Sequence, residues 1–170
     1  MKFKLTLLLV LFAFAFTLAQ SDYFKKKLKA DIIESDQGNG DGVFRARIKK
    51  TKLWGMYQGY GNTLIELIPA EYDSLHFIPF NGNFSAVYKD GKVGFYLSHW
   101  TYDDMAKQSV ACVYDDYQRF NYEGDKYLAV KKEEFWGWID WLTGEEKSEF
   151  KYASKEDLPA PSFKQDYWAE

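Results

Sequence analysis

The sequence predicts a mostly β fold built from antiparallel β-hairpins that form an open repeat array, with a short N-terminal helix as its cap. Three observations predict it. A phrase with a central glycine occurs three times, turn signals separate the strands, and the chain holds 13 Tyr, 14 Phe and 6 Trp. Aromatic side chains pack well on pleated sheets, and a phrase that recurs at a period of 20 to 50 residues is typical of repeat architectures.

The recurring phrase is an apolar residue, a glycine and a second apolar or aromatic residue. Gly55, Gly94 and Gly137 stand at its centre, 39 and 43 residues apart, and Trp54 and Trp136 precede two of them. Glycine inside a strand usually marks a bulge or a close approach of backbone. These five residues are therefore predicted to be structural positions of the repeat.

Two further phrases accompany each glycine strand in a fixed order. A strand that runs Ala-x-x-Lys into a turn precedes it, and a strand that ends in Tyr-Asp follows it. The Asp90-Gly91 turn is a strong hairpin signal, because glycine takes the positive φ that such a turn requires. The alanine strands are 43–48, 84–88 and 127–131, and the Tyr-Asp strands are 68–73, 112–115 and, in degraded form, 150–152.

These phrases resemble the WG-repeat family of bacterial proteins, whose repeat reads Trp-Gly-aromatic-Ile-Asp, then a turn, an apolar strand with proline, and Tyr-Asp. Residues 136–140 match it best and 68–73 come next. The middle copy departs from it, with Val93 in place of tryptophan. The resemblance covers about residues 42 to 153 and implies a β-rich array. It brings no catalytic residues with it.

The chain start has the pattern of a secretory signal peptide: Lys2 and Lys4, an apolar stretch to Phe16, and small residues up to Ala19. The apolar stretch is too short to span a bilayer. The protein is therefore expected to be exported, to the periplasm or beyond, with no membrane span in its mature chain. The predicted parts are a signal peptide at 1–19, an N-terminal cap and loop at 20–41, three repeat units at 42–153 and a C-terminal tail at 154–170.

The N-terminal cap is predicted from helical spacing. Phe24, Leu28 and Ile32 recur every four residues behind Ser21-Asp22. This pattern predicts a helix over 21–34 that covers the first unit.

Charge and cysteine content narrow the classes of partner. The 22 basic residues less Lys2 and Lys4, set against 25 acidic ones, leave a formal charge of about −5. A negative chain repels phosphate backbones and anionic lipids, so nucleic acid is not an expected partner. Cys112 is the single cysteine and is predicted to be a buried thiol.

No motif in the sequence predicts chemistry. The Asp-rich loop 36–42 fails as a calcium loop, because the position where a bidentate glutamate belongs holds Ile48. His76 and His99 have no ligand or triad partner at a recognised spacing. We expect no catalytic residue, no metal and no cofactor. Three acidic pairs, at 103–104, 115–116 and 133–134, leave one alternative, a hydrolase of envelope polymers that uses carboxylates from separate repeats.

The leading expectation is a non-catalytic module that binds or scaffolds a cell-envelope or extracellular protein or glycan. Large aromatic residues follow each glycine strand, and in a regular array they would lie along one edge as a ridge. Flat aromatic faces give large contact areas at low entropy cost. The predicted ridge comprises Tyr60, His99, Trp100, Tyr102 and Trp141.

Overall fold

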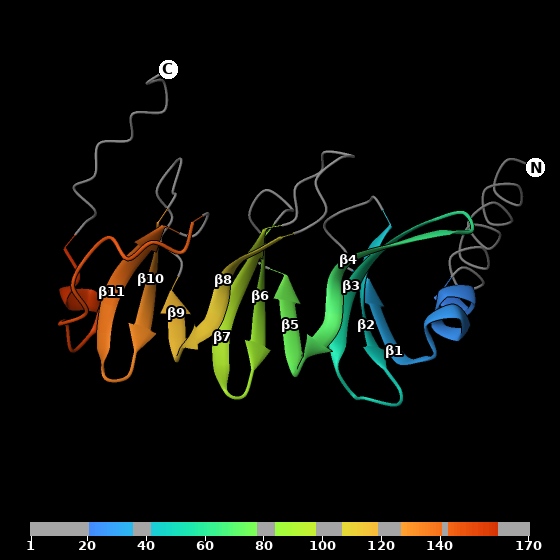
Figure 1. Cartoon of the computed structure of the whole chain (residues 1–170), viewed down its shortest axis with the longest axis horizontal. Coiled ribbons are helices and arrows are strands. Elements are labelled where there is room, and N and C mark those ends of the chain that lie inside the picture. Colours follow the sequence, from blue (N-terminus) through green and yellow to red (C-terminus); the bar gives the residue numbers. More distant parts are fainter. Residues whose placement is uncertain are drawn as a thin grey trace, which may run out of the picture.

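The computed structural model describes residues 21–35, 42–77, 84–97, 107–118, 127–140 and 143–159. Within these residues the protein is mostly β, with three antiparallel sheets and one α-helical segment (Figure 1). The expected mostly β fold is confirmed at this level. The predicted signal peptide lies outside the described residues.

Each sheet is a meander, in which strands that follow one another along the chain lie side by side. Consecutive strands joined by short turns pair in this antiparallel way. The first sheet comprises β1 (Ala30–Ser35), β2 (Val43–Ile48), β3 (Trp54–Tyr60) and β4 (Thr63–Tyr72). The second comprises β5 (Ser74–Phe77), β6 (Phe84–Lys89), β7 (Lys92–Leu97) and β8 (Lys107–Tyr114). The third comprises β9 (Asp116–Gln118), β10 (Tyr127–Lys132) and β11 (Phe135–Asp140).

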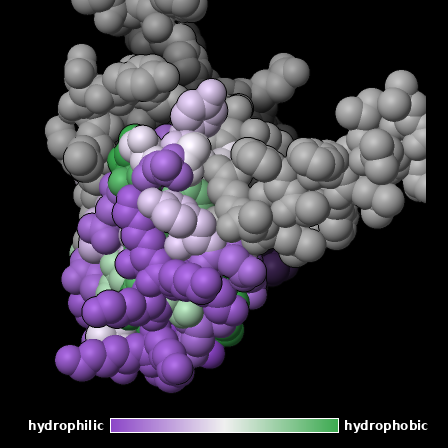
Figure 2. All heavy atoms as spheres, turned by 90° about the vertical axis from the view of Figure 1, so that its right-hand side faces the viewer, coloured by the Kyte–Doolittle hydropathy of each residue, from purple (hydrophilic) through white to green (hydrophobic). Residues whose placement is uncertain are grey.

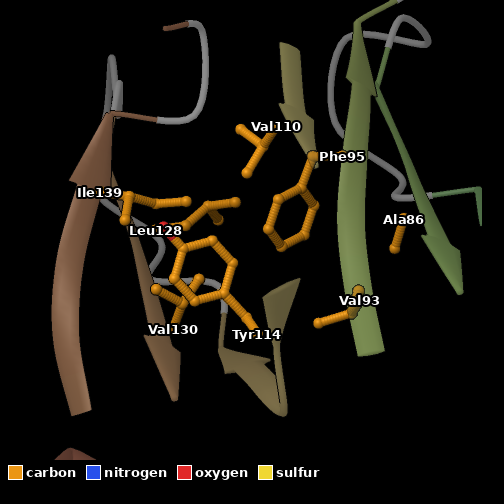
Figure 3. Packing of buried hydrophobic residues seen from close by; sticks show 8 residues of the cluster. All are labelled: Ala86, Val93, Phe95, Val110, Tyr114, Leu128, Val130 and Ile139. Carbon is orange, nitrogen blue, oxygen red and sulfur yellow. The ribbon is translucent and has the colours of Figure 1, made fainter. Parts of the chain in front are cut away.

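The three sheets pack against one another in chain order. β3 and β4 contact β5 and β6, and β7 and β8 contact β9 and β10 in the same way. Figure 3 shows Phe95 and Val110 of the second sheet pointing toward Leu128 and Ile139 of the third. The cluster between the first and second sheets comprises Val43, Met56, Ile68, Tyr72, Leu75, Val87 and Tyr96. The cluster between the second and third comprises Ala86, Val93, Phe95, Val110, Tyr114, Leu128, Val130 and Ile139.

The two outer faces of this row are covered by other parts of the chain. At one end Phe24, from the helical segment 21–28, is buried against Phe44 of the first sheet. At the other end the 3-10 helix η1 (Lys155–Asp157) leads into Leu158, which is buried with Trp138 of the third sheet. Each end of the row is thus closed by a segment that buries one large apolar side chain.

The helical segment is shorter than the sequence predicts. It ends at Leu28, and Lys29 takes a positive φ of 53°. The chain then enters β1, so Ile32 lies in a strand that pairs with β2. The predicted helix over 21–34 is therefore wrong beyond Leu28. Apolar residues at 24, 28 and 32 match a helical period, but pairing of β1 with β2 satisfies its backbone as a strand, with Ala30 buried and Ile32 partly buried.

The first hairpin has a different register from the one that the repeated alanines predict. Ala46 pairs with Gly55, whereas Ala86 pairs with Phe95. The reason is the turn at 49–52, which is longer than the two-residue turn of the second sheet. A shift of one residue moves a side chain to the other face of a strand. Ala46 accordingly faces the helical segment, while Ala86 faces the third sheet.

The glycines of the recurring phrase lie where another segment comes too close for a side chain. Gly55 and Gly94 lie beside irregular pairings in β4 and β8, where the longer stretch of the outer strand bulges. A Cβ at Gly94 would lie 2.6–2.7 Å from backbone atoms of 110–112. At Gly137 the ring of Phe150 would lie 3.0 Å from such an atom. These close approaches explain the glycines.

A single aspartate joins each sheet to the next. Asp73 lies between β4 and β5, and Asp115 lies between β8 and β9. The carboxylate of Asp73 accepts the N–H of Asp90 at 2.8 Å, and that of Asp115 accepts the N–H of Glu133 at 2.7 Å. Both donors belong to the hairpin turn of the following sheet. The tyrosine before each aspartate is buried, so the Tyr-Asp phrase packs one sheet and holds the next.

Candidate functional site

The row of sheets has two long edges. The turns 49–52, 90–91 and 133–134 lie along one of them, which we call the hairpin edge (lower in Figure 1). β3, β7 and β11 begin at the hairpin edge and end along the other, which we call the strand-end edge.

The hairpin edge carries lysines and carboxylates that pair with one another. Lys92 Nζ lies 2.5 Å from Asp115 Oδ1, and Lys89 Nζ lies 3.8 Å from Glu71 Oε2. The bond from Lys92 and the N–H of Glu133 lower the pKa of Asp115. Exposed pairs of this kind add little stability. Their consequence is an edge of mixed and largely compensated charge.

Two arginines of β2 lie beside the ring of Trp54, which is in β3. The Arg45 and Arg47 guanidinium carbons lie 5.4 and 6.0 Å from the centre of the Trp54 ring. Asp31 accepts bonds from Arg47 at 3.0 Å and from Lys52 at 2.6 Å, and these bonds hold the pKa of Asp31 well below its usual range. Sequence reasoning missed this cluster, because Asp31 falls where a helix was expected.

The strand-end edge exposes an aromatic residue at the tip of the β3–β4 hairpin. Tyr60 is 86% exposed. Tyr60 pairs with Thr63 and Gln58 with Ile65, so Tyr60 and the exposed Ile65 share one face of the hairpin. The other face of the hairpin lies over Phe24. Tyr60 is therefore directed away from the core.

The other predicted ridge residues lie outside the described residues. They are His99, Trp100, Tyr102 and Trp141. The described chain fixes only where their segments begin, because β7 ends at Leu97 and β11 at Asp140, both on the edge that carries Tyr60.

The acidic pair at 115–116 and the described histidine have local partners. Asp115 is engaged by Lys92 as above, and the Asp116 carboxylate accepts the N–H of Tyr117. His76 stacks edge-on with Tyr88, and burial together with the charge of Arg45 lowers its pKa. The acidic pair at 103–104 and the loop at 36–41 lie outside the described residues.

Metal-ligand groups, membrane spans and the thiol can be assessed for the described residues alone. Within them, no group of three His, Cys, Asp or Glu side chains is arranged to hold a metal ion. No helix there is both long and apolar enough to cross a membrane. Cys112 is partly buried rather than fully buried, with its Sγ 3.5 Å from the carbonyl oxygen of Val87. Burial raises the pKa of this thiol.

Comparisons with protein-family models, with curated proteins and with solved structures found no match. The geometry of the two edges is therefore the basis on which a function can be proposed.

Proposed function

We propose that this chain is an exported, non-catalytic β-repeat protein that binds or scaffolds a cell-envelope or extracellular protein or glycan. The three sheets would be three copies of one unit of the WG-repeat kind. The binding surface would be the strand-end edge, with Tyr60, Trp100 and Trp141 at its centre.

The pairing of one strand position is the same in all three sheets, and this supports the proposal that they are copies of one repeat unit. The residue before the glycine pairs with the tyrosine of the Tyr-Asp phrase in all three sheets: Trp54 with Tyr72, Val93 with Tyr114, and Trp136 with Tyr152. Two positions after the glycine, Tyr96 and Ile139 pack against the preceding sheet, and Tyr57 packs against the helical segment on the corresponding face. One packing scheme therefore serves three different sets of side chains, as repeat proteins require.

The observation that carries the binding proposal is the exposure of Tyr60 at an edge where two further glycine strands end. A large aromatic ring in water leaves apolar area uncovered, and such rings are the usual anchors of interfaces. Phe135, at the start of β11 on the hairpin edge, is 41% exposed, which is about half the value at Tyr60. Among the described residues, Tyr60 at the strand-end edge is therefore more exposed than the aromatic residue at the hairpin edge.

The alternative hydrolase draws no support from the described carboxylates. A glycosidase needs one carboxylic acid with a raised pKa, whereas the pKa values of Asp31, Asp115 and Glu149 are lowered by neighbouring basic side chains and, at Asp115, also by a backbone N–H.

The test changes Tyr60, Trp100 and Trp141 to Ser in one protein and measures capture from envelope extract and on a glycan array. We expect capture to be lost while the thermal midpoint stays within a few degrees, because exposed rings contribute little to folding. Phe135→Ser is the matched control at the hairpin edge and should keep capture. If the free energy of unfolding of the triple variant falls by several kcal/mol, these rings are part of the core instead. An intact native mass that includes residues 1–19 would contradict export.

A further inference from the structure

We propose that the two outer faces of the row form a head-to-tail docking site for a second copy of this chain, which the end segments keep closed. This inference rests on the proposed repeat, because it extends the packing between sheets to packing between molecules.

The second sheet presents one face to the first sheet and the other to the third. The first kind, which we call the upstream face, includes Val87 and Tyr96 in the second sheet and Val130 and Ile139 in the third. Register places Ala46 and Tyr57 of the first sheet at the same positions. The three upstream faces, in chain order, comprise Phe44, Ala46 and Tyr57; Ser85, Val87 and Tyr96; and Leu128, Val130 and Ile139.

The second kind, which we call the downstream face, follows the same rule. Met56 and Phe95, one position after the glycine, pack onto the next sheet. Trp138 is their equivalent in the third sheet, and Trp136 is the equivalent of Val93. The molecule therefore ends in an upstream face of the first sheet and a downstream face of the third. These are the two halves of the interface that it makes twice inside itself.

Both end faces are covered by short segments with few anchors. The helical segment has eight residues and buries Phe24, with Leu28 partly buried beside it. A helix of this length has little stability of its own. At the far end Leu158 is buried, and the Trp138 indole N–H donates to the Pro159 carbonyl at 3.1 Å.

The cover changes the chemistry of the surface. Figure 2 looks at the end that carries the helical segment, and the described surface there is mostly hydrophilic. Lys25, Lys26, Lys27 and Lys29 are all exposed on this segment. Without it, Phe44 and Tyr57 would form an apolar face of the kind that the preceding sheet covers elsewhere. Inside the molecule, an upstream face is covered by the downstream face of the preceding sheet. The partner that fits the upstream face of the first sheet is therefore the downstream face of another copy.

The experiment uses the full chain and releases one end segment at a time from the sheet face that it covers. Phe24→Asp removes the anchor of the helical segment, and Leu158→Asp removes the anchor at the far end. A head-to-tail contact needs one open face of each kind, so each variant alone should stay at the protomer mass. An equimolar mixture of the two should reach twice that mass, measured by light scattering after size exclusion. The double variant should form oligomers larger than a dimer, because each bound copy leaves one further open face of each kind.

Matched controls place the same charge on exposed neighbours, Tyr23→Asp and Ala153→Asp, whose mixture should stay monomeric. An excess of a peptide with the sequence of residues 21–30 should return the mixed dimer to monomers by covering the upstream face again.

Two results would overturn the proposal. A mixture of folded variants that stays monomeric shows that the faces do not fit, and a Phe24→Asp protein that dimerises alone shows a symmetric contact instead. Circular dichroism reports whether the variants fold, and Phe24→Ser with Leu158→Ser repeats the test with a milder change. The measurement uses purified protein without ligand, so failure of partner capture would leave it unaffected.

Discussion

The second and third sheets carry the same glycine phrase but fill the space beside the glycine differently. Beside Gly94 the bulged backbone of β8 occupies that space, with atoms of residues 110–112 within 2.7 Å of the point where a Cβ would lie. Beside Gly137 the ring of Phe150 does so, at 3.0 Å. β8 is a complete outer strand, whereas the described part of the third sheet has only two isolated bridges there. The same position of the recurring phrase therefore holds glycine for two different physical reasons. A backbone held in a hydrogen-bonded ladder cannot move aside, whereas a ring can rotate.

The largest expected effect is on the free energy of unfolding, which substitution by alanine should lower by different amounts at the two glycines. Gly94→Ala forces β8 to move away from β7 and should cost about 3 kcal/mol, at the upper end for overpacking. Gly137→Ala requires only a shift of the Phe150 ring and should cost about 1 kcal/mol. Urea unfolding of both variants measures the difference. Equal losses would mean that the outer strands constrain the two sheets alike.

A double variant sharpens the comparison. Phe150 is partly buried and stacks with Tyr114 at 6.1 Å, so Phe150→Ala should cost about 2 kcal/mol. When Phe150 is already alanine, Gly137→Ala should cost almost nothing, because the atom that it meets is gone. The same unfolding measurement gives the coupling between the two sites. Additive losses would show that something other than the Phe150 ring restricts Gly137.

The smallest expected effect is on the thermal midpoint, and it comes from the residue that follows the tyrosine at the end of each of the two sheets. Asp115 follows the second sheet, while Ala153 stands after Tyr152 in the third. Lys92 and the Glu133 N–H lower the folded pKa of Asp115 below its ordinary 3.8. Its contribution is therefore present above about pH 4 and is lost as pH falls through the folded pKa. Asp115→Asn should lower the thermal midpoint slightly at pH 7.

The difference between Asp115→Asn and the parent protein should shrink below about pH 4, where the parent carboxylate takes up its proton. Thermal melts from about pH 3 to about pH 7 measure it. If the difference in thermal midpoint stays constant over this range, protonation of Asp115 does not contribute to the loss of stability in acid. Ala153→Asn, at the position without a partner turn in the described chain, should show no such pH dependence.

Much of the sheet pattern was predictable, because it depends on short-range signals. Asp90-Gly91 forms its two-residue turn with φ of 55° and 75°, as a primed hairpin turn requires. β4 and β8 end at the tyrosine of the Tyr-Asp phrase. Glycine inside a strand indicated close backbone approach, although the sequence could not say whether backbone or a ring would approach.

The rest depended on contacts between distant residues. β1 has apolar residues that also fit a helical period, and only pairing with β2 decides between the two. The register of the first hairpin depends on a longer turn that contains Lys52 at a φ of 64°. In the candidate site Tyr60 is exposed, and the ridge as a whole stays a prediction. The cluster around Trp54 could not be predicted without knowing that Asp31 lies in a strand.

The one-residue connectors at Asp73 and Asp115 have a consequence for how the chain acquires its structure. Each apolar cluster between sheets joins only sheets that are neighbours in the chain. Ordering one sheet creates the surface on which the next can condense, so no long loop has to close before the first favourable contacts form. A chain that emerges N-terminus first can therefore fold progressively, one sheet at a time.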